Sequence, residues 1–164
     1  MLAAMELLDY AETQGKANFD WHTKVNETTR QECNITLGFL IGGGGTALAW
    51  AIQHASGSHP NMPLATAVIV LGIWLFALAM ALVWKCLSFV PSMAPANQPS
   101  HIYLPKFDTD GIREIQLQYL EKAIELTVSK GEKRALWLGH VRVLTCLSPL
   151  VFLAAWTAVA VALR

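Results

Sequence analysis

Three long apolar blocks constrain the fold more than any other feature of this sequence. They cover residues 35–53, 64–90 and 141–163, and the only charged residues within them are Lys85 and Arg142. A helix needs roughly 20 apolar residues to cross the hydrocarbon core of a bilayer, and each block is about this long. The sequence therefore predicts an all-α membrane protein with three transmembrane helices, and with cytoplasmic helices before the first span and between the last two.

The composition agrees with membrane insertion, and the residues before the first block argue that it is not a cleaved signal peptide. Hydrophobic residues make up 54% of the chain and charged residues only 15%, whereas soluble domains carry about 25% charged residues. A secretory signal begins at the extreme N-terminus with a basic region and a short apolar stretch. Here residues 1–34 come first, are mostly polar and contain more acids than bases. We expect them to form an N-terminal helical region ahead of the first span.

The distribution of lysine and arginine predicts the orientation. Cytoplasmic loops of membrane proteins carry an excess of these residues. None lies between the first two apolar blocks, whereas both flanking regions are rich in them: Lys16, Lys24, Arg30, and then Lys85, Lys106, Arg113, Lys122, Lys130, Lys133, Arg134 and Arg142. The N-terminus and the long connection are therefore expected in the cytoplasm, and the C-terminus on the opposite side.

The connection between the second and third spans has two parts. Residues 91–110 include PSMAPANQPSHIYLP, whose four prolines indicate a linker, and residues 111–140 have the periodicity of an amphipathic helix. Its apolar residues form two stripes, one of Ile112, Ile115, Tyr119, Ala123 and Leu126, the other of Leu117, Leu120, Ile124 and Val128. One stripe suffices for one neighbour, so two stripes predict a homo-oligomer. The alternative is a monomer whose second stripe lies against the lipid interface.

The first span has a run of glycines at its centre. Small residues let helices approach closely in lipid, where association depends on van der Waals packing. The run therefore predicts a helix crossing, and the alternative is a hinge or the narrow part of a pore. The residues assigned to pore lining or helix packing are Gly38, Gly42, Gly43, Gly44, Gly45 and Thr46.

Basic residues cluster at the predicted cytoplasmic membrane surface. One interpretation is that they reflect topology and contact with anionic lipids. The other is a binding site for a polyanion, either a cyclic nucleotide or an oligonucleotide, because repeated positive charge around an oligomer attracts phosphates. The candidate polyanion-binding residues are Lys130, Lys133, Arg134 and Arg142, joined by Lys24 and Arg30.

The sequence lacks the motifs of enzymatic and proton-coupled chemistry. It contains no P-loop, no HExxH, no CxxC and no Gly-x-Ser-x-Gly motif, so we expect no catalytic residues, no metal site and no cofactor. No ionisable residue lies in the middle of a span, and such residues mark proton and ion relays. A pore remains compatible with this pattern, because a hydrophobic constriction can gate by dewetting.

The arrangement resembles a known class of proteins. A cytoplasmic helix containing AETQGKANFDWHTKVN leads into a glycine-rich span, and after a second span and a Pro-rich linker, IREIQLQYLEKAIELTVSKGEKRALWLGHVRVL leads into the last. This layout is similar to that of the small transmembrane effectors of bacterial anti-phage defence systems, such as those of Pycsar, Hailong and some retrons. The resemblance covers nearly the whole chain and rests on no specific motif.

The resemblance implies a homo-oligomer in the bacterial inner membrane, with a periplasmic C-terminus. A nucleotide or nucleic-acid signal would control it, and activation would depolarise or permeabilise the membrane and cause abortive infection. The chain has no separate ligand-binding domain, so a cytoplasmic nucleotidyltransferase or sensor partner could supply recognition. The alternative function is a non-conducting membrane adaptor that scaffolds a cytoplasmic partner enzyme.

Overall fold

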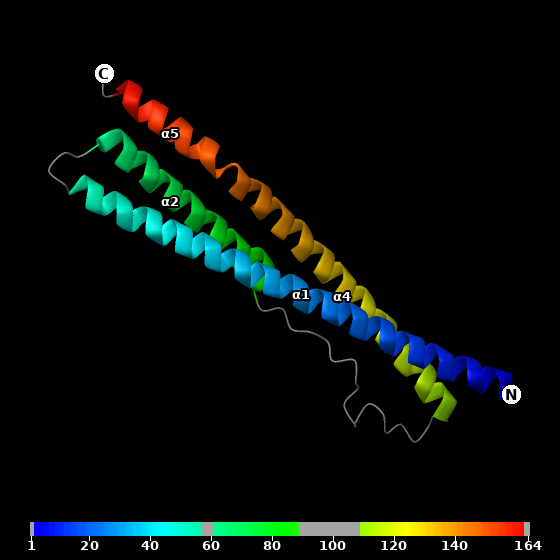
Figure 1. Ribbon diagram of the computed structural model, residues 1–164. Helices are drawn as coiled ribbons and strands as arrows, with labels where there is room; N and C mark the ends of the chain where they lie inside the picture. Colours follow the sequence, from blue (N-terminus) through cyan, green and yellow to red (C-terminus); the bar gives the residue numbers. More distant parts are fainter. Residues whose placement is uncertain (1, 57–60, 89–108, 163–164) are drawn as a thin grey trace. The chain divides into compact units, whose positions relative to one another are not determined.

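The protein is helical throughout the part that the structure describes. A computed structural model describes residues 2–56, 61–88 and 109–162 (Figure 1). The elements in chain order are α1 (Leu2–Ala55), α2 (Met62–Leu82), the π-helix η1 (Val83–Leu87), α4 (Thr109–Cys146) and α5 (Ser148–Ala162). The predicted all-α class is confirmed for these residues. The predicted linker at 91–110 lies outside them, except for its last two residues, which begin α4.

Several of these helices are compatible with membrane insertion. Two stretches, Leu7–Ala55 and Met62–Leu87, are long and apolar enough to cross a bilayer. Gly111–Cys146 and Ser148–Ala162 pass the same test together, across a bend of 41°. The described residues therefore contain two candidate spans, or three if the bent pair forms one.

The chain divides into two compact units. Unit 1 consists of Met1–Thr29 and Phe89–Lys133, and unit 2 of Arg30–Ser88 and Arg134–Arg164. Helices α1 and α4 each contribute residues to both units. In unit 1 the described part pairs the first half of α1 with the first half of α4, where Leu120 and Ala123 are buried.

Unit 2 has an apolar core in which four elements meet. The core residues are Cys33 and Leu40 of α1, Leu78, Ala79 and Leu82 of α2, Cys86 of η1, and Leu138 and Val141 of α4. Helix α2 also packs along α5. Several buried residues of α2 are small, namely Ala65, Ala67, Gly72 and Ala79, and small residues bring helix backbones close together.

Local sequence signals define the start of α2. The side chain of Asn61 accepts a hydrogen bond from the backbone N–H of Leu64 at 3.3 Å, which satisfies one of the free donors at a helix N-terminus. Pro63 lies in the first turn, where a helix has no use for the missing N–H.

Candidate functional site

Two consecutive residues of the glycine run face α2 within unit 2. A Cβ built on Gly44 would lie 3.2 Å from Phe76 Cε2 and 3.3 Å from the carbonyl oxygen of Gly72. A Cβ on Gly72 would lie 2.8 Å from Leu48 Cγ and 3.2 Å from the carbonyl oxygen of Gly44. A Cβ on Gly43 would be in ordinary contact, 3.6 Å from Leu75 Cδ1. At Gly44 and Gly72 the two helix backbones therefore approach each other closely.

The other glycines of the first candidate span have open space where a side chain would be. A Cβ on Gly38, Gly42 or Gly45 would meet nothing within 4 Å. These positions are separated by four and three residues, so they lie on one side of α1. The side chain of Thr46, also on the outer surface, donates to the carbonyl oxygen of Gly42 at 2.8 Å. Together they form an outward face of small residues, which we call the small-residue face.

Three further threonines of the candidate spans direct their hydroxyl protons to their own helices. Thr36 donates to Glu32, Thr145 to Val141 and Thr157 to Leu153, each onto a backbone carbonyl one turn earlier at 2.8 to 3.0 Å. Toward any other group these hydroxyls can therefore act only as hydrogen-bond acceptors. Surfaces of this kind are weakly polar, as a hydrophobic constriction requires.

The candidate polyanion-binding residues divide between the two units. Lys24, Lys130 and Lys133 belong to unit 1, whereas Arg30, Arg134 and Arg142 belong to unit 2. Within unit 2, Arg142 Nη2 lies 2.9 Å from Glu32 Oε2. Arg142 therefore already has an anionic partner, and this pair is half-exposed on both sides.

The two apolar stripes of α4 are buried along the line between them. Ala123 of the first stripe and Leu120 of the second are both buried. Tyr119 and Leu126, on the far side of the first stripe, are 54% and 43% exposed. Helix α1 lies against the second stripe in unit 1, because a Cβ on Gly15 would come within 2.7 Å of Leu120 Cδ2.

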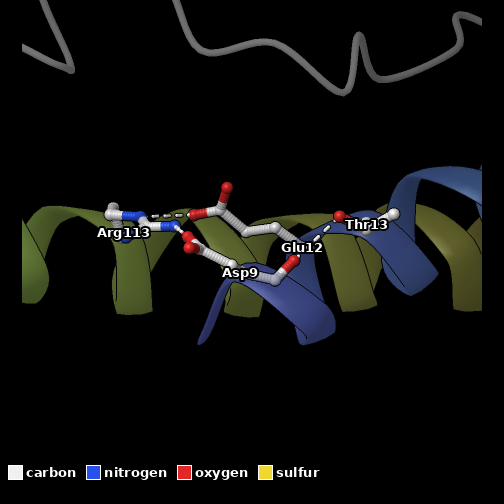
Figure 2. A network of polar contacts seen from close by, with 4 residues as sticks. All are labelled: Asp9, Glu12, Thr13 and Arg113. Carbon is white, nitrogen blue, oxygen red and sulfur yellow. Dashed lines mark hydrogen bonds and ion pairs between the residues drawn. The ribbon is translucent and has the colours of Figure 1, made fainter. Parts of the chain in front are cut away.

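An ion cluster in unit 1 was not anticipated from the sequence. Arg113 of α4 donates to Glu12 Oε1 at 2.7 Å and also to Asp9 Oδ1, and both carboxylates come from α1 (Figure 2). The hydrogen bond to Glu12, followed by that to Asp9, raises the pKa of the Arg113 guanidinium above its usual value. In the sequence, Asp9 and Glu12 are three residues apart and so share one face of a helix. The sequence does not indicate that Arg113 is their partner.

A polar contact between α1 and α4 was also missed. Asn26 Nδ2 donates to the backbone carbonyl of Thr127 at 2.9 Å in a part-buried position. A Cβ on Gly131 would clash with Asn26 Oδ1, so this glycine leaves room for the Asn26 side chain in its present position. The contact explains a glycine within a helix that otherwise continues through it.

Comparison of the chain with models of known families, with curated proteins and with solved structures gives no match.

Proposed function

We propose that this protein is a membrane effector of bacterial anti-phage defence that assembles into a homo-oligomeric pore. In this proposal a nucleotide or nucleic-acid signal gates the pore, and its opening depolarises or permeabilises the inner membrane. The observation that carries the proposal is the small-residue face, where a Cβ on Gly38, Gly42 or Gly45 would meet nothing within 4 Å.

A bare glycine surface gains little from contact with lipid. Helices in a bilayer associate through close van der Waals packing, and small residues are enriched where they do so. Gly44 already serves this purpose inside the subunit, against Gly72. The opposite side of the same helix offers a second small surface, and another copy of α1 fits it because the two surfaces are alike.

Exposed apolar side chains in unit 1 also support assembly. Four of them recur along one side of α1 at helical spacing and are 43 to 68% exposed: Leu7, Tyr10, Trp21 and Val25. The predicted orientation has unit 1 in the cytoplasm, where a partner that covers exposed apolar side chains is stabilised by their removal from water. Packing of neighbouring subunits along α1 would cover this surface.

The basic residues and the layout support a phosphate-bearing signal. Lys24, Lys130 and Lys133 lie in unit 1, and repetition of such residues around an oligomer attracts phosphate-bearing ligands. The resemblance to small transmembrane defence effectors supplies the biological context. Recognition through a nucleotidyltransferase or sensor partner is compatible with the same arrangement.

The test compares two glycines that are both open within unit 2. Gly42→Leu fills the small-residue face, whereas Gly139→Leu makes the same change on α4, where a Cβ also meets nothing within 4 Å. We expect Gly42→Leu to reduce the oligomer mass in detergent and to lower the conductance in planar bilayers by about tenfold, the effect of ~1.4 kcal/mol. Gly139→Leu should leave both close to the parent values.

The conductance measurement uses the purified full chain, with and without a panel of cyclic mononucleotides and cyclic dinucleotides. A protein that never passes ions under any of these conditions would overturn the pore and favour the adaptor function. Equal effects of Gly42→Leu and Gly139→Leu would contradict the proposal that subunits assemble through the small-residue face.

A further inference from the structure

One charged residue lies at the end of the second candidate span. Lys85 is the only charged residue of Met62–Leu87, and it lies in η1 at the C-terminal end of this segment. A lysine so close to hydrocarbon extends its ammonium group toward the polar layer of the membrane. Its surroundings therefore determine what the ammonium meets there.

Two indole rings flank this ammonium group. Lys85 Nζ lies 5.0 Å from the ring centroid of Trp84 and 5.5 Å from that of Trp137. Both distances are within the range of cation–π attraction. The indoles are themselves accessible, with Trp84 72% and Trp137 42% exposed, and tryptophan is enriched at the headgroup level of membranes.

The geometry of η1 exposes Trp84 and Lys85, and a hydrogen bond from η1 to α4 holds the two helices together. Val83, Trp84 and Lys85 are exposed in succession, whereas Cys86 is buried. The thiol of Cys86 donates to the backbone carbonyl of Arg134 at 3.8 Å. The π-helix is a rare geometry that often marks functional sites, and here it turns an aromatic–basic pair toward the surroundings beside a helix that contributes Trp137.

Lys85 forms no ion pair with a carboxylate of the residues that the structure describes. Indole faces attract a cation without neutralising it. In the partly dehydrated interfacial layer, an anionic oxygen is the group that would complete the site.

We propose that Trp84, Lys85 and Trp137 form a binding site for a phosphodiester anion. The ammonium pairs with a phosphate oxygen, and the two indoles pack beside the group that the phosphate carries. This chemistry is shared by the headgroup of an anionic phospholipid and by a cyclic nucleotide. The site requires insertion of unit 2 into a membrane but does not require a pore, so it can be tested separately from conduction.

The lipid arm of the test uses the full chain reconstituted in nanodiscs containing phosphatidylglycerol and phosphatidylcholine. The readout is the phosphatidylglycerol that remains with each subunit after detergent extraction, measured by native mass spectrometry. Lys85→Gln should lower its retention by about fivefold, which corresponds to ~1 kcal/mol for one basic residue at a membrane surface. Trp137→Leu should lower it less, and Lys85→Arg should retain it.

The soluble arm uses nanodiscs of phosphatidylcholine alone, to which dimethyl phosphate or cyclic AMP is added. Broadening of the ³¹P resonance reports binding, and its loss in Lys85→Gln assigns the site to a soluble phosphodiester. Lys122→Gln is the matched control, because Lys122 is an exposed lysine of unit 1. The proposal is overturned if Lys85→Gln behaves as the parent in both arms, or if Lys122→Gln causes an equal loss.

Discussion

At the scale of single residues, the glycines are the most informative positions. Gly44 and Gly72 allow one backbone to lie against another, since either Cβ would come within 3.3 Å of the opposite carbonyl oxygen. Gly131 makes room for the side chain of Asn26. A Cβ on Gly38, Gly42 or Gly45 would meet nothing within 4 Å. One residue type thus has three different structural roles along three helices, α1, α2 and α4.

A substitution at the crossing tests the first of these roles. Gly72→Ala should destabilise unit 2 by about 1–3 kcal/mol, the usual cost of overpacking, because its Cβ would press on Leu48 and on the Gly44 carbonyl. Unfolding of the purified protein in mixed detergent micelles, followed by far-UV circular dichroism, measures the change. Gly139→Ala has open space around it and should be neutral or slightly stabilising. Equal stability of the two variants would contradict the crossing.

At the scale of elements, the bend between α4 and α5 is the main departure from regular helix. Pro149 has no N–H, so the carbonyl of Thr145 loses its usual helical donor. The chain continues through short-range bonds, with Leu150 N donating to Leu147 O at 3.0 Å and Val151 N to the same oxygen at 3.3 Å. Proline is one of the few recognised causes of a sharp helix kink, and Pro149 accounts for the 41° angle.

Restoring the missing donor should straighten this pair of helices. Pro149→Ala is expected to lengthen the distance between spin labels at Leu136 and Val161, two exposed positions of unit 2. The increase should be about 2 Å, because the parts of α4 and α5 between each label and the bend rise 1.5 Å per residue and would become collinear. Pulsed electron paramagnetic resonance on a background with exposed Cys146 replaced by alanine measures it. An unchanged distance would attribute the bend to the packing of α2 on α5 instead.

At the scale of the whole molecule, the arrangement of charge predicts the topology. Lysine and arginine flank the first two apolar blocks but do not occur between them, and this bias orients membrane proteins. The two or three candidate spans of the structure are compatible with insertion. With three spans, the two ends of the chain lie on opposite sides of the membrane.

Reporter fusions in bacteria test this topology. Alkaline phosphatase fused after Arg164 should be active, because it folds only in the periplasm, and green fluorescent protein fused before Met1 should be fluorescent. A second phosphatase fusion, placed in the connection before α4, is the control and should be inactive. Phosphatase activity at the connection, or none at the C-terminus, would reject the three-span orientation.

Part of the candidate sites could be predicted from the sequence alone. Hydropathy and helical periodicity indicated helices and apolar blocks, because these depend on composition and on spacing along the chain. The glycine run and the basic residues were also visible. The sequence did not indicate which residues contact one another in these sites. Arg113 binds acids about one hundred positions away, and Trp137 lies near Lys85 although it belongs to another helix.

The sequence by itself determined that the chain is helical and contains blocks able to enter a membrane, because every backbone polar group in lipid must be satisfied within a helix. Only the tertiary structure decided which side of α1 each glycine faces. Gly44 lies against α2 and Gly42 faces outward, although they are two residues apart in an unbroken run. The physical reason is that glycine has no side chain whose polarity would indicate burial or exposure. Its role therefore depends on which part of the chain packs against it.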